Sequence, residues 1–152
     1  DLDPYLLEPS ATGNATYVLG HSHAHGEVRT FKLERIEHVE STGRVFVPRD
    51  VREIVDRLAA SWGIYLGDDD HHVVLEVEAA VAPRMMESTW HSSQRVQWLR
   101  DGRARIEFRL PSLTEFVPWV RSWGPNVTVI QPEELRRDVA DSLRAAAELY
   151  GT

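Results

Sequence analysis

Five side chains near the N-terminus have the chemistry to bind a nucleotide. They are an aromatic ring, an imidazole and three basic groups, namely Tyr17, His21, Arg29, Lys32 and Arg35. An aromatic ring stacks on a base, while guanidinium and ammonium groups hold phosphate. These residue types therefore suit single-stranded nucleic acid or a nucleotide. The competing interpretation is structural, with Tyr17 packed in a core and Arg35 paired with Glu34 or Glu37.

Two short strands must position this set. Residues 16–20 are apolar and β-prone, 21–27 are rich in turn formers, and 28–33 contain β-branched and aromatic residues. Arg29 and Arg35 are six residues apart, so in an extended strand they would point the same way and lie roughly 20 Å apart. A turn at 34–35 would bring them closer.

Other candidate sites are weaker. His21, His23 and His25 alternate, and in an extended segment all three could bind a metal ion. Alternating histidines in a polar turn are more often solvated, so no metal or other cofactor is expected. Ser22 and Ser92 do not lie in a G-x-S-x-G elbow, and no nucleophile with an adjacent base is evident. We therefore expect no enzyme activity.

The segment 16–36 resembles the WYL domain, a small Sm-like β-barrel of bacterial transcription regulators. Residues 29–36, RTFKLERI, match the second half of its motif, and 16–18, TYV, stand at its name-giving Trp-Tyr-Leu. Residues 3–5, DPY, resemble the opening strand of the family. The resemblance implies a ligand-sensing domain in which basic residues at the positions of Arg29 and Arg35 bind nucleic acid or nucleotides.

Composition sets the outer limits. The 152 residues could bury one core or two small ones, and 42% hydrophobic with 27% charged residues is ordinary for a globular protein. The net charge of −7 argues against a surface coated for non-specific nucleic-acid binding. Cysteine is absent, which is compatible with the cytoplasm, and no apolar run could span a membrane.

The N-terminal part predicts an all-β domain over residues 1–47. Turn signals at 13–14 and 41–43 separate about five strands, the last over 45–47, as a small Sm-like or SH3-like barrel needs. A connecting helix and linker should occupy 48–70. Its apolar positions, Val51, Ile54, Val55, Leu58 and Trp62, follow a helical period, and Gly67 to Asp70 form an acidic, flexible break.

The C-terminal part, residues 71–152, alternates strands and helices. We expect strands over 73–77, 94–99, 104–110 and 127–130, helices over 80–88 and from 113 to 124, and a last helix from Pro132. Pro118 should bend the second helix or shorten its start. The order strand, helix, strand, strand, helix, strand predicts a ferredoxin-like domain, so the whole chain is of the α+β class.

This part resembles the C-terminal extension (WCX) that often follows WYL domains, through residues 90–94, 119–124 and 132–136. The resemblance implies the effector-sensing and oligomerising region of a helix-turn-helix regulator, whose promoter-binding domain lies upstream of Asp1. We expect a homodimer to which residues after Val73 contribute. Trp90, Trp98, Trp119 and Trp123 are either core residues or part of that subunit contact. The alternative is a purely structural dimerisation module that binds no ligand.

Overall fold

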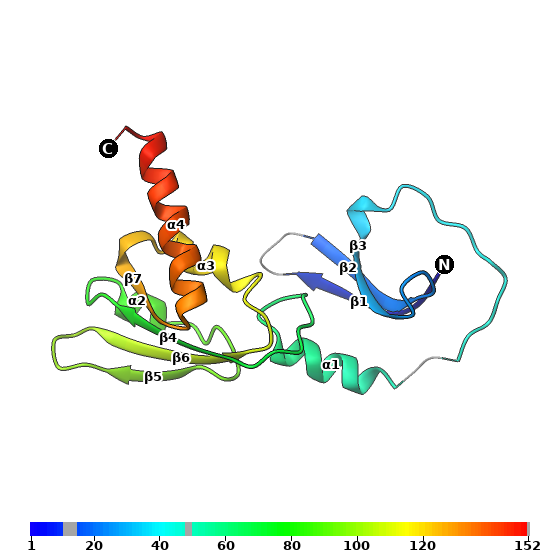
Figure 1. Cartoon of the computed structure of the whole chain (residues 1–152). Coiled ribbons are helices and arrows are strands. Elements are labelled where there is room, and N and C mark those ends of the chain that lie inside the picture. Colours follow the sequence, from blue (N-terminus) through cyan, green and yellow to red (C-terminus); the bar gives the residue numbers. More distant parts are fainter. Residues whose placement is uncertain (11–14, 48–49, 152) are drawn as a thin grey trace. The chain divides into compact units, whose positions relative to one another are not determined.

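The computed structural model describes residues 1–10, 15–47 and 50–151 and divides into two compact units (Figure 1). The N-terminal unit comprises Asp1–Leu58 and Gly63–Tyr65, and the C-terminal unit comprises Ala59–Trp62 and Leu66–Thr152. Both contain an antiparallel sheet, so the α+β class expected from the sequence is confirmed.

The N-terminal unit is built on a three-stranded sheet. Its elements in chain order are β1 (Leu2–Ser10), β2 (Ala15–Ser22), β3 (Glu27–Lys32), the 3-10 helix η1 (Leu33–Arg35) and α1 (Val51–Ala60), whose last two residues group with the C-terminal unit. The strands lie in the order β1-β2-β3. The central strand β2 supplies most of the buried positions, including Val18 and Leu19. A bulge in β1 between Pro4 and Leu6 shifts its register against β2.

The strand expected over 45–47 is not present. Val45 and Val47 are 97% and 90% exposed, and residues 36–47 contain no strand. The apolar pattern there was a good strand signal, but no neighbouring strand supplies backbone partners for it. The described residues of this unit therefore contain three of the five strands that a small barrel was expected to need. The turn expected at Gly13 and Asn14 lies outside the described residues.

The C-terminal unit contains four strands and three helices. They are β4 (His71–Val77), α2 (Ala82–Met86), β5 (Arg95–Trp98), β6 (Ala104–Leu110), α3 (Phe116–Ser122), the 3-10 helix η2 (Gly124–Asn126), β7 (Val127–Gln131) and α4 (Glu133–Leu149). The sheet order is β5-β6-β4-β7, and every neighbouring pair is antiparallel. The predicted sequence of elements over this part of the chain is confirmed.

The helices cover one face of this sheet. On β4 and β6 every second side chain is buried, among them Val73, Leu75, Ile106 and Phe108, and these pack with residues of α2, α3 and α4. The intervening side chains, such as His72 and Arg109, lie on the opposite face, which we call the open face. The main cluster of buried nonpolar residues thus lies on the helix side of the sheet, while Val74 is also buried, at 7% exposed, on the open face.

Large aromatic rings extend the core beside α3. Trp119 lies 4.8 Å from Trp62, 5.2 Å from Trp90 and 6.0 Å from Trp123, measured between ring centroids. Trp62 was expected on the stripe of α1, but the helix ends at Ala60 and the ring packs in the C-terminal unit instead. Among the four tryptophans expected in the core or at a subunit contact, Trp98 is the most open, at 53% exposed.

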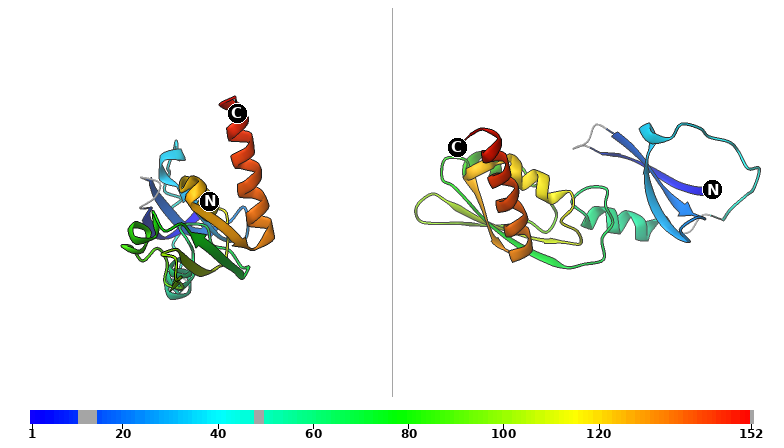
Figure 2. Two further views of the ribbon diagram at one scale, coloured as in Figure 1. Left: turned by 90° about the vertical axis from the view of Figure 1, so that its left-hand side faces the viewer. Right: turned by 45° about the horizontal axis from the view of Figure 1, so that its top comes forward.

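The helix ends also differ in part from expectation. Helix α3 begins at Phe116, so Pro118 lies in the first turn, where its missing N–H costs nothing. The shortened start expected from Pro118 is confirmed. Helix α4 buries Leu135 and Val139, but its C-terminal half projects beyond the sheet and leaves Tyr150 exposed (Figures 1 and 2).

The acidic segment before β4 is held against the C-terminal unit. A Cβ atom at Gly67 would lie only 1.9 Å from the Pro111 carbonyl oxygen, so the two backbones touch. The Asp69 N–H donates to that same oxygen at 3.3 Å, and Asp70 pairs with Arg109 at 3.1 Å. Residues 67–70 therefore make specific contacts where the sequence suggested a flexible break.

Candidate functional site

The pairing of β2 with β3 decides which candidate residues share a face. Tyr17 pairs with Lys32, His21 pairs with Val28, and Gly20 pairs with Arg29. Because successive side chains of a strand point to opposite faces, Tyr17, His21 and Lys32 lie on one face of the sheet. Arg29 lies on the other. The structure thus brings three of the five predicted residues together and separates Arg29 from them.

Arg35 lies beyond the strand. Residues Leu33–Arg35 form η1, so the chain turns after Lys32, and the 20 Å separation expected for an extended strand does not apply. In the described part of the chain, the Arg35 side chain forms no hydrogen bond or ion pair, and it is exposed. The pairing of Arg35 with Glu34 or Glu37, which the structural interpretation required, is not formed.

The Glu34 carboxylate bonds a backbone N–H group instead of Arg35. Its Oε1 accepts a hydrogen bond from the Thr16 N–H at 3.1 Å, which ties η1 to the start of β2. Hydrogen bonds from its own N–H and from that of Thr16, followed by the nearby Lys32 charge, hold the pKa of the Glu34 carboxyl below its usual value. The carboxylate therefore braces the turn that carries Arg35.

Arg29 has a partner of its own. Its Nη2 lies 2.6 Å from Oε1 of Glu27, and both side chains are more than half exposed. An exposed ion pair of this kind contributes little to stability, so it neither fixes the fold nor prevents other contacts. The pair does lower the positive charge on that face of the sheet.

The histidines of the β2–β3 turn do not share a strand face. Residues 23–26 form the turn, where His23 pairs with Asp3 at 2.9 Å and His25 Nδ1 bonds the Ser22 hydroxyl at 2.8 Å. His21 remains on β2, and its Nδ1 is buried without a hydrogen-bond partner among the described residues. Within those residues, no group of three or more potential ligands is placed to hold a metal ion.

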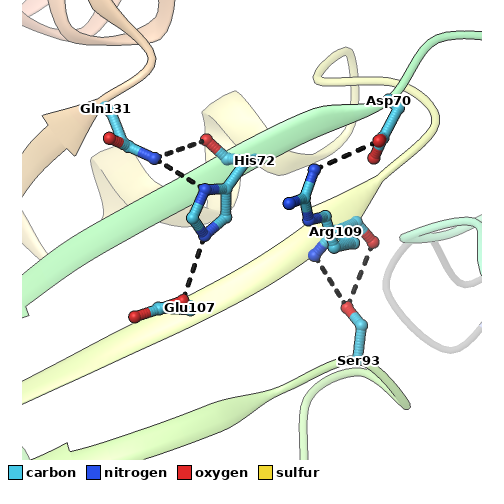
Figure 3. A network of polar contacts seen from close by, with 6 residues as sticks. All are labelled: Asp70, His72, Ser93, Glu107, Arg109 and Gln131. Atoms are coloured by element: carbon cyan, nitrogen blue, oxygen red, sulfur yellow. Dashed lines mark hydrogen bonds and ion pairs between the residues drawn. The ribbon is translucent and has the colours of Figure 1, made fainter.

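A second polar cluster, which the sequence interpretation missed, lies on the open face of the C-terminal sheet (Figure 3). His72 bonds Glu107 and Gln131, while Arg109 bonds Ser93 and Asp70. The sequence signal that could have revealed this cluster is the alternation of apolar and charged residues along β6. The buried positions 106, 108 and 110 of β6 require the intervening charged residues to share the other face.

Two family models match the chain. A WCX domain model matches residues 69–147, just over half of the chain, and a WYL domain model matches residues 1–41. The chain belongs to the WYL–WCX family. We therefore call the N-terminal unit the WYL unit and the C-terminal unit the WCX unit. The family expected from the motifs at 16–36, 90–94, 119–124 and 132–136 is confirmed.

Proteasome accessory factor B/C (PafBC) of Arthrobacter aurescens is a solved structure similar to this chain. The sequences are 25% identical, the TM-score is 0.46, and the match covers 100% of this chain and 22% of that one. The chain thus spans less than a quarter of the length of PafBC. No curated protein matches the chain.

Proposed function

We propose that the chain is the effector-sensing region of a bacterial transcription regulator and that its WYL unit binds single-stranded nucleic acid or a nucleotide. Membership of the WYL–WCX family supports the regulatory role. The observation that carries the binding proposal is the pairing of Tyr17 with Lys32 on one face of the sheet, with Arg35 three residues further on and without a partner among the described residues. An aromatic ring and two cations at the end of one strand pair suit a base and its phosphates.

Each residue of the proposed site has a distinct role. The Tyr17 ring stacks on a base, and Lys32 and Arg35 hold phosphate oxygens. His21 shares the face of Tyr17 and Lys32, and the exposed part of its ring contacts the ligand, because its Nδ1 is buried. Arg29 contributes least, since it lies on the opposite face and is paired with Glu27.

The remaining features of the proposal concern architecture. The strand order β5-β6-β4-β7 supports a ferredoxin-like assignment for the WCX unit, and we propose an Sm-like barrel for the WYL domain. We place the domains at 1–47 and 71–152, with 48–70 connecting them. The matched ranges support this division, although residues 66–70 group with the WCX unit by their contacts.

We also propose the setting in which the chain acts. It forms a homodimer in the cytoplasm, has no catalytic activity and contacts promoter DNA through a separate helix-turn-helix domain. The family of the chain supports this regulatory setting. In the described part of the chain, no helix combines the length and apolar character needed to cross a membrane.

A second candidate function is a structural dimerisation module that binds no ligand. The ion pair between Arg29 and Glu27 favours it, because a basic residue of the predicted site is already neutralised by the protein. The two candidates differ in one measurable property. Only the sensing region binds an oligonucleotide in a manner that depends on Lys32 and Arg35.

Fluorescence anisotropy with a labelled single-stranded oligothymidine, at two salt concentrations, tests the proposal. The parent should bind, and binding should weaken steeply with salt because counterions are released from the phosphates. Arg35→Ala should weaken binding by about tenfold or more, Lys32→Ala somewhat less, and Arg29→Ala little. Arg144→Ala is the control, since Arg144 is an exposed, ion-paired residue of α4 in the other unit.

Two results would reject the proposal. One is a parent chain that binds neither the oligonucleotide nor a nucleotide at low salt. The other is an Arg35→Ala variant that binds as tightly as Arg144→Ala. Either would leave the structural dimerisation module as the better description of this chain.

A further inference from the structure

The open face of the WCX sheet contains a pocket of about 260 Å³, lined by His72, Ser93, Arg95, Glu107, Phe108 and Arg109. Three adjacent strands, β4, β5 and β6, and the segment just before β5 supply these residues. Figure 3 shows four of the lining residues, His72, Ser93, Glu107 and Arg109, together with Asp70 and Gln131, which bond to them. The pocket is separate from the WYL unit, and its interpretation does not rest on the function proposed above.

Arg95 is a charged side chain at the pocket without a bonding partner among the described residues. It stands directly opposite Glu107 in the pairing of β5 with β6, where an ion pair is expected. Glu107 instead bonds His72, with 3.0 Å between its Oε2 and the histidine Nε2. In the part of the chain that the structure describes, the exposed Arg95 side chain makes no ion pair or hydrogen bond. One guanidinium at the pocket wall is therefore free to bind an anion.

The backbone of Arg109 is held in place by hydrogen bonds with the Ser93 side chain. The Ser93 hydroxyl accepts a hydrogen bond from the Arg109 N–H at 2.9 Å and approaches its carbonyl oxygen at 3.1 Å. Ser93 is fixed in turn by buried His91, whose Nδ1 lies 2.7 Å from the hydroxyl and whose Nε2 lies 3.0 Å from the Ala60 carbonyl oxygen. The hydrogen bonds of Ser93 and His91 thus fix the position of the Arg109 backbone.

The Arg109 guanidinium still has donors to offer. Asp70 contacts only its Nη1, and a guanidinium carries five N–H donors. Arg95 and Arg109 are diagonal neighbours across β5 and β6, so their strand positions are about 7–8 Å apart. Side chains of this length can reach one anion from two sides.

His72 and Glu107 form the other half of the pocket. The Gln131 amide donates to His72 Nδ1 at 2.8 Å, so the neutral ring carries its proton on Nε2 and donates it to Glu107. This arrangement engages one carboxylate oxygen of Glu107. The other has no hydrogen-bond partner among the described residues and is available to accept a bond from a ligand hydroxyl.

We propose that this pocket binds a small phosphate monoester that also carries hydroxyl groups. Phosphate presents three oxygens in a tetrahedral arrangement that two guanidiniums can share, whereas the two coplanar oxygens of a carboxylate are satisfied by one. Glu107 receives a hydroxyl of the same ligand. A volume of 260 Å³ lies just below the usual range of small-molecule pockets, so a phosphorylated sugar fits the size and a dinucleotide does not.

Isothermal titration calorimetry of the 152-residue chain with glucose 6-phosphate tests this inference, with glucose, inorganic phosphate and citrate as comparison ligands. The parent should bind glucose 6-phosphate saturably, more tightly than inorganic phosphate, and should not bind glucose. Arg95→Ala should weaken binding by roughly 10- to 100-fold, as expected for loss of a charge-assisted hydrogen bond. Arg144→Ala should bind as the parent does.

Arg95→Ala is the decisive variant because this exposed, unpartnered side chain can be removed without disturbing the fold. An unchanged melting temperature checks this. Arg109→Lys adds a second test, because it keeps the charge beside Asp70 but loses the planar fork, and it should also weaken binding. In the parent, the NMR signal of the His72 ring should shift on binding, and in Arg95→Ala it should shift only at much higher ligand concentration.

Several outcomes would overturn the proposal. They are no saturable binding of glucose 6-phosphate at low salt, tighter binding of citrate than of glucose 6-phosphate, and equal binding by the parent and Arg95→Ala. Binding of inorganic phosphate that is insensitive to Arg95→Ala would indicate an adventitious ion only. A WYL unit that fails to bind oligonucleotides would leave this inference untouched, so the two proposals fail separately.

Discussion

The protonation of Glu34 makes the turn that carries Arg35 dependent on pH, because the Glu34 carboxylate accepts the hydrogen bond that holds this turn. Backbone N–H groups of Glu34 itself and of Thr16 hold its pKa below the usual value, with a smaller contribution from Lys32. A carboxyl group whose pKa is lower in the folded state stabilises that state above its unfolded pKa. This stabilisation is lost as the pH falls through the folded pKa.

An NMR titration tests this pH dependence. The Glu34 carboxyl carbon should titrate with a midpoint below 4.5, its ordinary value. The turn that carries Arg35 should loosen over the same acidic range, as seen in the amide signal of Thr16. Glu34→Gln removes the titration and should leave the Thr16 amide unchanged over this range. A midpoint at or above the ordinary value would contradict this account.

The alternation of side chains along a strand allows part of the candidate site to be predicted from the sequence. Arg29 and Lys32 are three positions apart, so their separation onto opposite faces follows from any unbroken strand over 27–32. The placement of Arg35 did not follow, because the turn at η1 depends on a bond between Glu34 and Thr16, eighteen positions apart in the chain. Local sequence patterns carry no information about such a bond.

At the scale of elements, the backbone contact at Gly67 sets a requirement on the segment before β4. A methyl group there would overlap the Pro111 carbonyl, and no side-chain rotation relieves a clash with backbone. We expect Gly67→Ala to destabilise the WCX unit by about 3 kcal/mol in thermal or urea denaturation.

Gly26→Ala is a useful comparison for that variant. Gly26 has a φ of 71° and open space around its Cβ position, so its substitution strains only the backbone, at about 1 kcal/mol. A Gly67→Ala variant that is as stable as the parent would show that the segment does not pack against Pro111.

Trp62 gives a second test at this scale. Its ring centroid lies 4.6 Å from that of Phe116 and 5.5 Å from that of Phe108, in edge-on contacts. We expect Trp62→Ala to cost about 3 kcal/mol of unfolding free energy, since it leaves a cavity beside the core. Trp98→Ala, at a residue 53% exposed on the edge strand β5, should cost less than about 1 kcal/mol. Equal losses in the two variants would be inconsistent with this core.

The elements that the sequence predicted well are those with a strong local pattern. Strand β6 alternates apolar and polar residues because one face is buried, and β4 contains the apolar run Val73–Leu75. Residues 45–47 are also a short apolar run, but they lack a neighbouring strand in the structure. Pairing depends on distant parts of the chain, so composition alone was misleading there.

At the scale of the whole molecule, the two units differ in the size of their cores. The WCX unit buries sixteen residues in one cluster. Among the residues of the WYL unit that the structure describes, the buried hydrophobic ones are Ala15, Val18, Leu19, Ile54 and Ile64. Hydrogen exchange followed by mass spectrometry should therefore show slower exchange in β4 and β6 than in β2. Exchange from β2 that is as slow as from β6 would contradict this ranking.

The chain crosses between the two units more than once, and this limits how it can be divided. Trp62 belongs to the WCX unit, the following residues Gly63–Tyr65 belong to the WYL unit, and Leu66 returns to the WCX unit. A single cut by a protease or a stop codon therefore cannot yield both units intact. A cut before Ala59 deprives the WYL unit of buried Ile64, and a cut after Tyr65 deprives the WCX unit of Trp62. Gene fusions that exchange WYL and WCX halves between relatives would inherit this mismatch unless residues 59–66 were exchanged as a matched set.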